Sequence, residues 1–247
     1  MFLSRLILNN RNAQVRSELA RPYEMHRTLL RAFPKGKVGI ERVDENAAGI
    51  LFRVDENSRE NLIAVLVQSK TVPNWGFLVG QKDVRGHRYL LPESVITDGK
   101  PNPAITDDFD IEKKIHAGQT LAFRLRANPT KRLGKSAGAD QSKRVGIYDE
   151  EEQVKWLKEK LEGDENRPQI DGGFKLKRWQ ISREEKIENS NAINRADQSH
   201  DLKLFSVQFD GIIQVVDPVK AANTISMGIG SAKGFGFGLL SIAPVKE

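Results

Sequence analysis

Residues 21–33 read RPYEMHRTLLRAF, and this stretch predicts a helix that follows a first strand at Phe2–Asn9. Pro22 suits the first helical position, because its φ is fixed at about −65° and it has no N–H that needs a partner. Helical spacing then places Met25 and Leu29 on one stripe, which is expected to face a hydrophobic core. The chain therefore begins with a strand and an amphipathic helix.

A second face of this helix carries side chains that can do chemistry. Tyr23 and His26 are three residues apart and share this face, with Arg27 and Arg31 alongside. A phenol, an imidazole and guanidinium groups on one surface can transfer protons while they hold an anion. The alternative is that His26 is an ordinary histidine at the surface or at the edge of the core.

The remaining hydrophobic patterns predict more strands and further helices. In the first half of the chain, strands are expected at Phe2–Asn9, Val38–Val43, Gly49–Val54, Leu62–Gln68 and Leu121–Ala127. In the second half, helices are expected at Asp149–Leu161 and Val219–Met227, and the capping pair Asp217-Pro218 opens the latter. The strands expected there are Arg144–Tyr148, Phe174–Ile181, Leu202–Phe209, Ile212–Val216 and Leu239–Ile242, with a hairpin turn at Asp210-Gly211.

Each half therefore approximates the order strand, helix, two strands, helix, strand, with a short helix expected around Trp75 in the first half. This order is the split βαβ, or ferredoxin-like, arrangement. We expect an α+β fold of two tandem ferredoxin-like (RRM-like, βαββαβ) domains over residues 1–133 and 143–247. The small and polar residues 134–142 are the predicted linker, and the polar stretch 182–201 is expected to be a hairpin tip or loop.

Composition narrows the possible chemistry. The 247 residues include no cysteine, which excludes disulfides, thiolate catalysis and cysteine-based metal sites. The 4 histidines lack the spacing of metal ligands, so neither a metal site nor a cofactor is expected. The net charge of +6 favours a polyanionic partner. No hydrophobic run approaches the roughly 20 residues that span a bilayer, so we expect no membrane partner and a cytoplasmic location.

Two further segments are suited to binding phosphates. The strand at Leu121–Ala127 alternates, which puts Arg124 and Arg126 on one face, and Lys131 and Arg132 follow directly. Glycines are dense over residues 228–240, where the backbone can approach a ligand closely and expose its N–H groups. The alternatives are an ordinary solvated basic face for the strand and a structural glycine bulge for the loop.

Three segments, in this order, resemble the CRISPR-associated endoribonucleases of the CasE (Cse-type) family. They read PYEMHRTL at residues 22–29, LRANPTKR at residues 125–132, and GIGSAKGFGFGLL at residues 228–240. The likeness covers nearly the whole chain and includes VVDP at residues 215–218. It implies that His26 is the catalytic histidine and Tyr23 the active-site tyrosine, whereas Arg31 stands where some relatives have lysine.

The resemblance also implies an activity and partners. The expected activity is metal-independent cleavage of CRISPR precursor RNA at the base of the repeat hairpin, by attack of the RNA's own 2′-hydroxyl. The expected partners are the CRISPR repeat RNA hairpin and other Cascade subunits, with the product retained. The residues expected to bind RNA are Arg27, Arg124, Arg126, Lys131, Arg132, Gly228, Gly230, Lys233, Gly234 and Gly236.

The stretch 182–201 departs from the family, because relatives place a strongly basic hairpin there and this chain has few basic residues. No base-reading arginine is therefore assigned. Two alternatives to the nuclease remain open. One is a non-catalytic RNA-binding or architectural subunit of a CRISPR ribonucleoprotein, and the other is a metal-dependent nuclease, which EDTA would inhibit.

Overall fold

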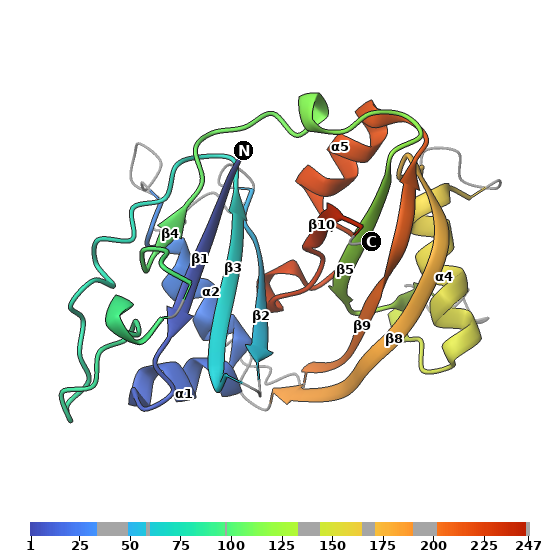
Figure 1. The fold of residues 1–247 in the computed structure, drawn as a ribbon. Helices are drawn as coiled ribbons and strands as arrows, with labels where there is room; N and C mark the ends of the chain where they lie inside the picture. The colour runs from blue at the N-terminus through green and yellow to red at the C-terminus, as the bar shows by residue number, and fades with distance from the viewer. Residues whose placement is uncertain are drawn as a thin grey trace, which may run out of the picture. The chain divides into compact units, whose positions relative to one another are not determined.

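The computed structural model describes residues 1–33, 49–57, 60–96, 98–132, 144–164, 171–189 and 202–245. The chain divides into two units, which can be followed by residue number in Figure 1. The first unit comprises Met1–Asp110 together with Gly234–Gly236, and the second comprises Ile111–Lys233 and Phe237–Glu247. Each unit is built on a four-stranded antiparallel sheet, which confirms the expected α+β class with two domains.

The first unit contains β1 (Phe2–Leu8), α1 (Ala13–Ala20), α2 (Pro22–Leu30), β2 (Leu51–Asn57), β3 (Leu62–Ser69) and β4 (Ala104–Ile105). Its strands lie in the order β2-β3-β1-β4, as in a ferredoxin-like sheet. The short helix predicted around Trp75 is wrong. The described residues 76–80 form turns, and Trp75, which directly precedes them, is buried in the core. The regular structure before β4 is the 3-10 helix η1 (Glu93–Val95).

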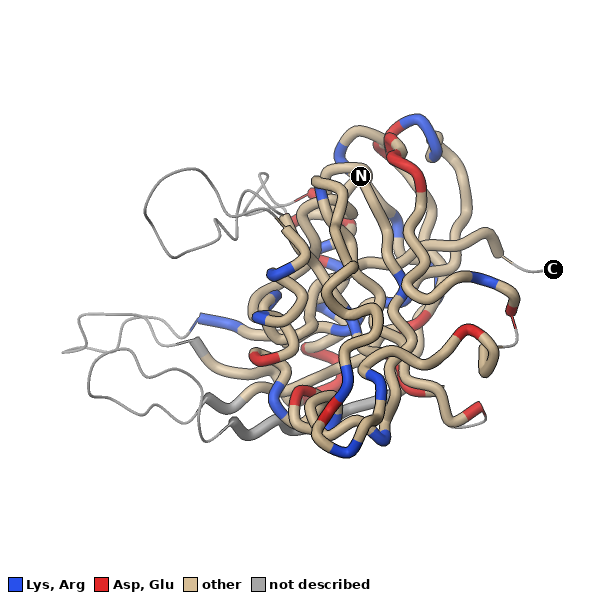
Figure 2. The backbone as a smooth tube through the Cα atoms, turned by 90° about the vertical axis from the view of Figure 1, so that its left-hand side faces the viewer, with Lys and Arg blue, Asp and Glu red and all other residues tan. Residues whose placement is uncertain are grey.

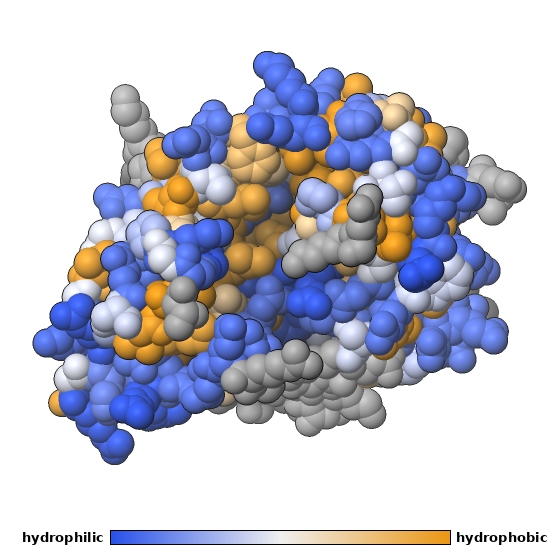
Figure 3. Space-filling model, in the orientation of Figure 1, coloured by the Kyte–Doolittle hydropathy of each residue, from blue (hydrophilic) through white to orange (hydrophobic). Residues whose placement is uncertain are grey.

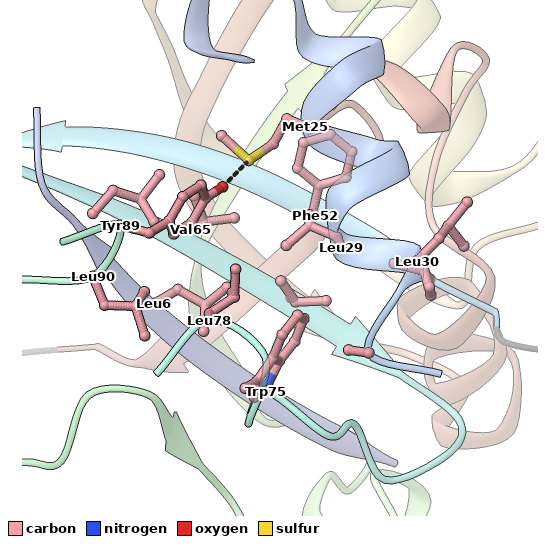
Figure 4. Close-up of a cluster of buried hydrophobic side chains, with 14 of the residues drawn as sticks. Leu6, Met25, Leu29, Leu30, Phe52, Val65, Trp75, Leu78, Tyr89 and Leu90 are labelled. Atoms are coloured by element: carbon pink, nitrogen blue, oxygen red, sulfur yellow. Dashed lines mark hydrogen bonds between the residues drawn. The ribbon is translucent and has the colours of Figure 1, made fainter. Parts of the chain in front are cut away.

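The core of the first unit lies between α2 and one face of the sheet. Met25 and Leu29 of α2 pack with Leu6 of β1, Phe52 of β2 and Val65 of β3 (Figure 4), and all five are at most 1% exposed. The stripe that helical spacing predicts is thus confirmed as the buried one. Its burial fixes the rotation of α2 about its axis, and therefore the direction in which the other faces of the helix point.

The second unit contains β5 (Thr120–Ala127), β6 (Thr130–Arg132), β7 (Arg144–Gly146), α4 (Glu150–Glu162), β8 (Phe174–Asn189), β9 (Leu202–Val215), α5 (Pro218–Met227) and β10 (Leu240–Pro244). The sheet order β10-β5-β9-β8 repeats that of the first unit, and β6 pairs separately with β7. Both predicted helices are confirmed. Asp149 and Asp217 cap them, each accepting hydrogen bonds from backbone N–H groups of the first turn.

The strand β5 belongs to the second unit, although the sequence analysis places it in the first domain. Its residues pair with β9 on one side and β10 on the other, so that Leu125 lies opposite Phe209 and Leu240. The second unit accordingly begins at Ile111. The predicted linker 134–142 and the predicted strand Val38–Val43 lie outside the described residues.

The hairpin turn predicted at Asp210-Gly211 is wrong, because β9 runs without interruption through both residues. Gly211 lies opposite Phe123 of β5 and Trp179 of β8. A Cβ at position 211 would lie 2.1 Å from the carbonyl oxygen of Arg178. The glycine therefore permits a close approach of two backbones, next to an irregularity in the β8–β9 pairing, and does not mark a turn. Likewise, β8 extends to Asn189 through the first residues of the predicted loop 182–201.

Charged residues are spread through both units. Lys and Arg are interspersed with Asp and Glu along the described chain (Figure 2). Hydrophilic residues also predominate on the face drawn in Figure 3, with apolar groups between them. Within the part of the chain that the structure describes, no helix is long and apolar enough to cross a membrane. Attraction of a polyanion therefore depends on local groups of basic side chains.

Candidate active site

Helix α2 positions the candidate catalytic side chains. Pro22 occupies its first turn, as the sequence predicts, and Arg21 precedes it without a side-chain capping hydrogen bond. The helix is also held at its far end, because the Thr28 hydroxyl donates a 2.7 Å hydrogen bond to the buried carboxylate of Glu18 in α1. With the Met25 stripe buried, His26 is 5% exposed and lies at the edge of the core.

His26 belongs to a group of four rings, called here the ring cluster, which consists of Tyr23, His26, Phe52 and Phe235. The imidazole stacks on Phe52 of β2, with ring centroids 5.9 Å apart and an interplanar angle of 11°. Tyr23 lies one helical turn earlier, 6.2 Å from His26, and contacts Phe235 at 5.6 Å. The structure thus brings Tyr23 and His26 together, as their spacing predicts, and adds two rings from distant parts of the sequence.

The backbone of the glycine-rich segment lies beside His26. A Cβ placed on Gly234 would be 3.4 Å from Cδ2 and 3.6 Å from Nε2 of the imidazole. Gly236 contacts Phe52 similarly, since a Cβ there would be 3.2 Å from Cε2 of that ring. Gly234–Gly236 are counted within the first unit for this reason, although the residues on both sides of them belong to the second.

The two arginines of α2 lie outside the ring cluster. Arg27 forms an exposed ion pair with Glu24 at 3.1 Å, one turn earlier on the helix. The guanidinium of Arg31 lies 4.5 Å from the centroid of the Phe77 ring. Five residues of α-helix leave Arg31 about 140° around the axis from His26. Both charges are therefore near the helix, but the structure places neither against the imidazole.

A buried carboxylate that the sequence analysis missed supports this helix. Glu18 is 4% exposed and accepts hydrogen bonds from Thr28, from the Tyr89 hydroxyl at 2.6 Å and from Gln14 at 2.7 Å. Burial raises the pKa of Tyr89 well above its ordinary value, and the Glu18 carboxylate adds to the rise. The only signal in the sequence is that Glu18 lies on the apolar side of a short helix, next to Val15.

The basic strand β5 has the predicted alternation. Leu125 is fully buried, whereas Arg124 and Arg126 lie on the opposite face. Arg124 pairs with Asp210 at 2.5 Å, and Arg126 donates to the Ser206 hydroxyl at 2.8 Å. Burial raises the pKa of the Asp210 carboxyl, but hydrogen bonds from Ser182, Arg124 and Gln208 outweigh it and leave that pKa below its ordinary value.

Two predicted RNA-binding residues follow β5 on β6. Lys131 forms an exposed ion pair with Glu152 of α4 at 3.2 Å, and Arg132 is exposed. Both lie in the second unit, as do the two arginines of β5. A phosphate would therefore compete with existing carboxylate partners for Arg124 and Lys131.

The glycine-rich segment connects α5 to β10. Gly228 ends α5 with φ of 71°, and Gly230 has φ of 84°, a conformation that glycine adopts without strain. Lys233 donates to the carbonyl oxygen of Met227 at 2.5 Å, and burial lowers the pKa of its amine. Lys233 thus helps to close the loop on itself. No group of three potential metal ligands occurs among the residues described.

Comparison with known proteins assigns the family. The model of a family described as "CRISPR associated protein" matches residues 1–244. The chain therefore belongs to this family of CRISPR-associated proteins, and within it to the CasE (Cse-type) members.

Individual relatives agree over nearly their full length. The chain is 33% identical over 250 residues to the CRISPR-associated endoribonuclease Cse3 of Thermus thermophilus, covering 99% of this chain and 100% of that protein. It is 27% identical to the CRISPR system Cascade subunit CasE of Escherichia coli K12, with the same coverage. A structure of Thermus thermophilus Cse3 bound to an RNA representing a pre-cleavage complex superposes with a TM-score of 0.68, at 32% identity and with 98% of each chain covered.

Proposed function

We propose that this protein is an endoribonuclease that cleaves CRISPR precursor RNA at the base of the repeat hairpin. The observation that carries the proposal is the pairing of Tyr23 and His26 on one helix, held by a buried stripe and by Glu18. The full-length similarity to Cse3, a relative named as an endoribonuclease with a structure in a pre-cleavage RNA complex, supports it.

The proposed reaction uses a nucleophile that belongs to the substrate. The ribose 2′-oxygen attacks the adjacent phosphorus, its proton leaves, and the bond from phosphorus to the 5′-oxygen breaks. That oxygen takes up a proton, so the products are a 2′,3′-cyclic phosphate and a 5′-hydroxyl. The protein must align the attack in line with the leaving oxygen and handle two proton transfers.

Each candidate residue has a role in this scheme. His26 transfers a proton, because an imidazole has an ordinary pKa of about 6.5 and can donate or accept near neutral pH. Tyr23 orients the 2′-hydroxyl or assists the leaving oxygen. Arg31 lies outside the ring cluster, at the C-terminal end of α2, and contributes positive charge. This charge would stabilise the transition state, in which the phosphate oxygens carry more negative charge than before the attack.

RNA binding is proposed to combine phosphate contacts with recognition of the A-form stem by its shape. Arg124, Arg126, Lys131 and Arg132 of the second unit supply cationic groups. The product remains bound, and the protein acts as a subunit of Cascade, as does the CasE protein of Escherichia coli, which this chain matches over its full length.

The proposal is tested by replacing the imidazole. His26→Ala should lower the single-turnover cleavage rate by about 10²–10⁴-fold and leave the Kd for a repeat hairpin nearly unchanged. The measurement is made in EDTA, with the RNA ends identified as cyclic phosphate and hydroxyl. His116→Ala removes an exposed histidine of the second unit and serves as the control.

The same experiment addresses the alternatives. Equal loss of binding and cleavage in His26→Ala would assign the imidazole a structural role, which its burial favours. Inhibition by EDTA would indicate a metal-dependent nuclease. Absence of cleavage by the unmodified protein, together with stable binding of the hairpin, would indicate a non-catalytic subunit.

A further inference from the structure

A group of basic side chains lies beside the start of α1 in the first unit. The segment between β3 and β4 turns back over residues 82–88, where Lys82 and Arg88 form a β-bridge (Figure 1). Asn12, which caps α1, donates a 2.7 Å hydrogen bond to the carbonyl oxygen of His87. This contact joins the turn 82–88 to residues 10–16. The exposed basic side chains of these two stretches are called here the basic tip: Arg11, Arg16, Lys82, Arg85 and Arg88.

The acidic residue of these two stretches is turned inward. Asp83 is the only Asp or Glu within residues 10–16 and 82–88, and its side chain is 5% exposed. The carboxylate accepts hydrogen bonds from the backbone N–H groups of Ala13 at 2.8 Å and of Arg85 and His87 at 2.9 Å. The bond from Ala13, together with those from His87 and Arg85, lowers the pKa of this carboxyl to about 2. Asp83 therefore attaches the turn to α1, with the His87 imidazole 3.4 Å away, and is not an ion-pair partner for the basic tip.

Carboxylates do not neutralise the cations of the basic tip. Within the described part of the chain, no ion pair is formed by Arg11, Arg16, Lys82, Arg85 or Arg88. Arg16 donates to the carbonyl oxygens of Asn10 and Arg11, at 3.2 and 2.6 Å, which hold the guanidinium without removing its charge. By contrast, Arg124 and Lys131 of the second unit already pair with carboxylates. The basic tip therefore offers phosphate groups cations that have no carboxylate to give up.

The composition of the basic tip favours RNA over a protein partner. Residues 10–16 and 82–88 contain no Phe, Tyr or Trp, and the one large apolar side chain exposed there is Val84. Protein interfaces are commonly anchored by aromatic side chains and depleted in lysine. Lysine and arginine without such anchors suit phosphate groups. Because there is no ring for bases to stack on, these contacts would recognise the RNA backbone and not its sequence.

The place of the basic tip in the chain relates it to one part of the substrate. Helix α1 has 8 residues, about 12 Å, and α2 with His26 follows directly after Arg21. Cleavage at the base of a hairpin has the stem on one side of the scissile linkage and single-stranded RNA, called here the flank, on the other. The cations proposed to bind the stem belong to the second unit. The basic tip, on the unit that carries His26, is therefore left for the flank.

We propose that the basic tip binds the phosphate backbone of the flank. The contact is independent of the flank's sequence and adds to the affinity for the precursor. Cleavage ends this contact, because the flank is no longer joined to the hairpin product that the protein retains. This inference rests on the proposed function, which defines where the flank begins.

The test compares two RNAs that cannot be cleaved, because hydrogen replaces the 2′-hydroxyl at the scissile linkage. One ends just past this linkage, and the other continues into a flank of about ten nucleotides. The unmodified protein should bind the flanked RNA about tenfold more tightly at near-physiological salt. The triple variant Lys82→Gln, Arg85→Gln, Arg88→Gln should lose this preference while its Kd for the short RNA stays nearly unchanged. Its slope of log Kd against log salt concentration for the flanked RNA should fall by about 2.

A matched control removes the same charge elsewhere. Lys70→Gln, Lys100→Gln, Lys114→Gln changes exposed side chains outside the basic tip and should keep the preference for the flank. Both triple variants alter exposed positions, so an unchanged Tm is expected. With cleavable flanked RNA at saturating protein, the basic-tip variant should cleave at the normal single-turnover rate. A lower rate at saturation would overturn the inference, since the basic tip would then affect the chemistry.

The remaining outcomes separate this inference from the function on which it rests. Equal affinity of the unmodified protein for the two RNAs would overturn the inference and leave the proposed function standing. Equal weakening of both RNAs in the basic-tip variant would assign the basic tip to the stem and overturn it. Unchanged RNA binding with loss of co-purification of other Cascade subunits would indicate an acidic protein partner and also overturn it. If His26→Ala cleaves normally, the proposed function fails, whereas the flank preference, measured without cleavage, is unaffected.

Photo-crosslinking locates the contact without any variant. A photoreactive thiouridine placed in the flank of the uncleavable RNA should crosslink to peptides that contain residues 10–16 or 82–88. The same nucleotide placed in the loop of the hairpin should not. Crosslinks from the flank to other peptides alone would overturn the inference.

Discussion

Glu18 links the two helices of the first unit through a single buried carboxylate. It accepts hydrogen bonds from Thr28 on α2, from Tyr89 and from Gln14, each 2.6–2.7 Å long. Hydrogen bonds to a charged acceptor are stronger than neutral ones, and a buried donor without its acceptor is costly. The position of α2, and with it that of His26, therefore depends on a residue with no role in the chemistry.

The first prediction concerns the stability that this carboxylate provides. Glu18→Ala should lower the free energy of unfolding by about 3 kcal/mol, because it leaves the buried Tyr89 and Thr28 hydroxyls without their acceptor. Urea denaturation measures the change. Glu24→Ala is the control, since it removes a carboxylate whose ion pair with Arg27 is exposed. A similar loss in both variants would contradict the assignment.

Tyr23→Phe isolates the contribution of one hydroxyl group. The ring, and therefore the contacts with His26 and Phe235, is retained. We expect an unchanged Tm and a single-turnover rate lower by about 10-fold to 10²-fold, in line with the loss of one proton-handling or orienting group. Cleavage at the normal rate would exclude the phenol from the reaction and leave Tyr23 as a packing residue.

The sequence identifies residues of the site that are local to one helix and misses those that folding brings together. Tyr23 and His26 can be placed side by side from their spacing alone. Phe52, Phe235 and Glu18 reach them from other elements, and no periodicity relates their positions. The contact of Arg31 with Phe77 cannot be predicted from the sequence either, because Phe77 lies in a segment without regular secondary structure.

At the scale of elements, helices were predictable because their ends carry local signals. Asp149 and Asp217 each accept hydrogen bonds from the first turn of the predicted helix that follows. Asn12 caps α1 in the same way, but the sequence analysis does not predict that helix. Strand partners carry no such signal. The grouping of β5 with β9 and β10 depends on pairings between residues at least 80 positions apart in the sequence, and so the predicted domain boundary lies after β5 instead of before it.

The Gly211 position gives a prediction for β9. Because a Cβ there would lie 2.1 Å from the carbonyl oxygen of Arg178, Gly211→Ala must separate β8 from β9 locally. We expect a loss of about 3 kcal/mol in the free energy of unfolding. Gly146→Ala, whose methyl group would meet only the exposed ring of Tyr148, is the control. A hairpin turn at Asp210-Gly211 could also be destabilised by the alanine, so amide hydrogen exchange is measured as well. Pairing of Gly211 with Phe123 predicts slow exchange of the backbone amides there, whereas a turn predicts no such protection.

The ion pair between β5 and β9 gives a pH prediction. The Asp210 carboxyl has a lowered pKa in the folded protein. Its contribution to stability is therefore fully present above the unfolded pKa of about 4 and is lost as the pH falls through the lower, folded value. Asp210→Asn should be less stable than the unmodified protein at neutral pH, and the difference should shrink as the pH is lowered below about 4. A difference that grows toward low pH would contradict this.

At the scale of the whole molecule, both units repeat one order of strands within the sheet, although α5 precedes the last sheet strand of the second unit and no described α-helix directly precedes β4 in the first. The repeat was visible in the sequence because it depends on local periodicity, which each element carries by itself. The exchange of Gly234–Gly236 into the first unit was not visible. A segment of three residues is too short to give a periodic hydrophobic pattern. Its closely spaced glycines are equally compatible with a structural bulge that makes no contact with the first unit.

The net charge of +6 favours a polyanionic partner, but the number of phosphates that local basic side chains contact decides how RNA affinity depends on salt. Each phosphate contact releases counterions, so log Kd should change linearly with log salt concentration. Lys131→Ala should lower the magnitude of this slope by about 1, and weaken binding to all stems alike. Lys220→Ala is the control and should leave the slope unchanged. It removes a lysine of α5 that forms an ion pair with Asp171.

Since Lys131 already pairs with Glu152, Glu152→Gln should strengthen RNA binding at low salt by freeing the Lys131 amine. If Lys131→Ala leaves the slope as it was, Lys131 does not contact the RNA backbone, and its ion pair with Glu152 persists in the complex.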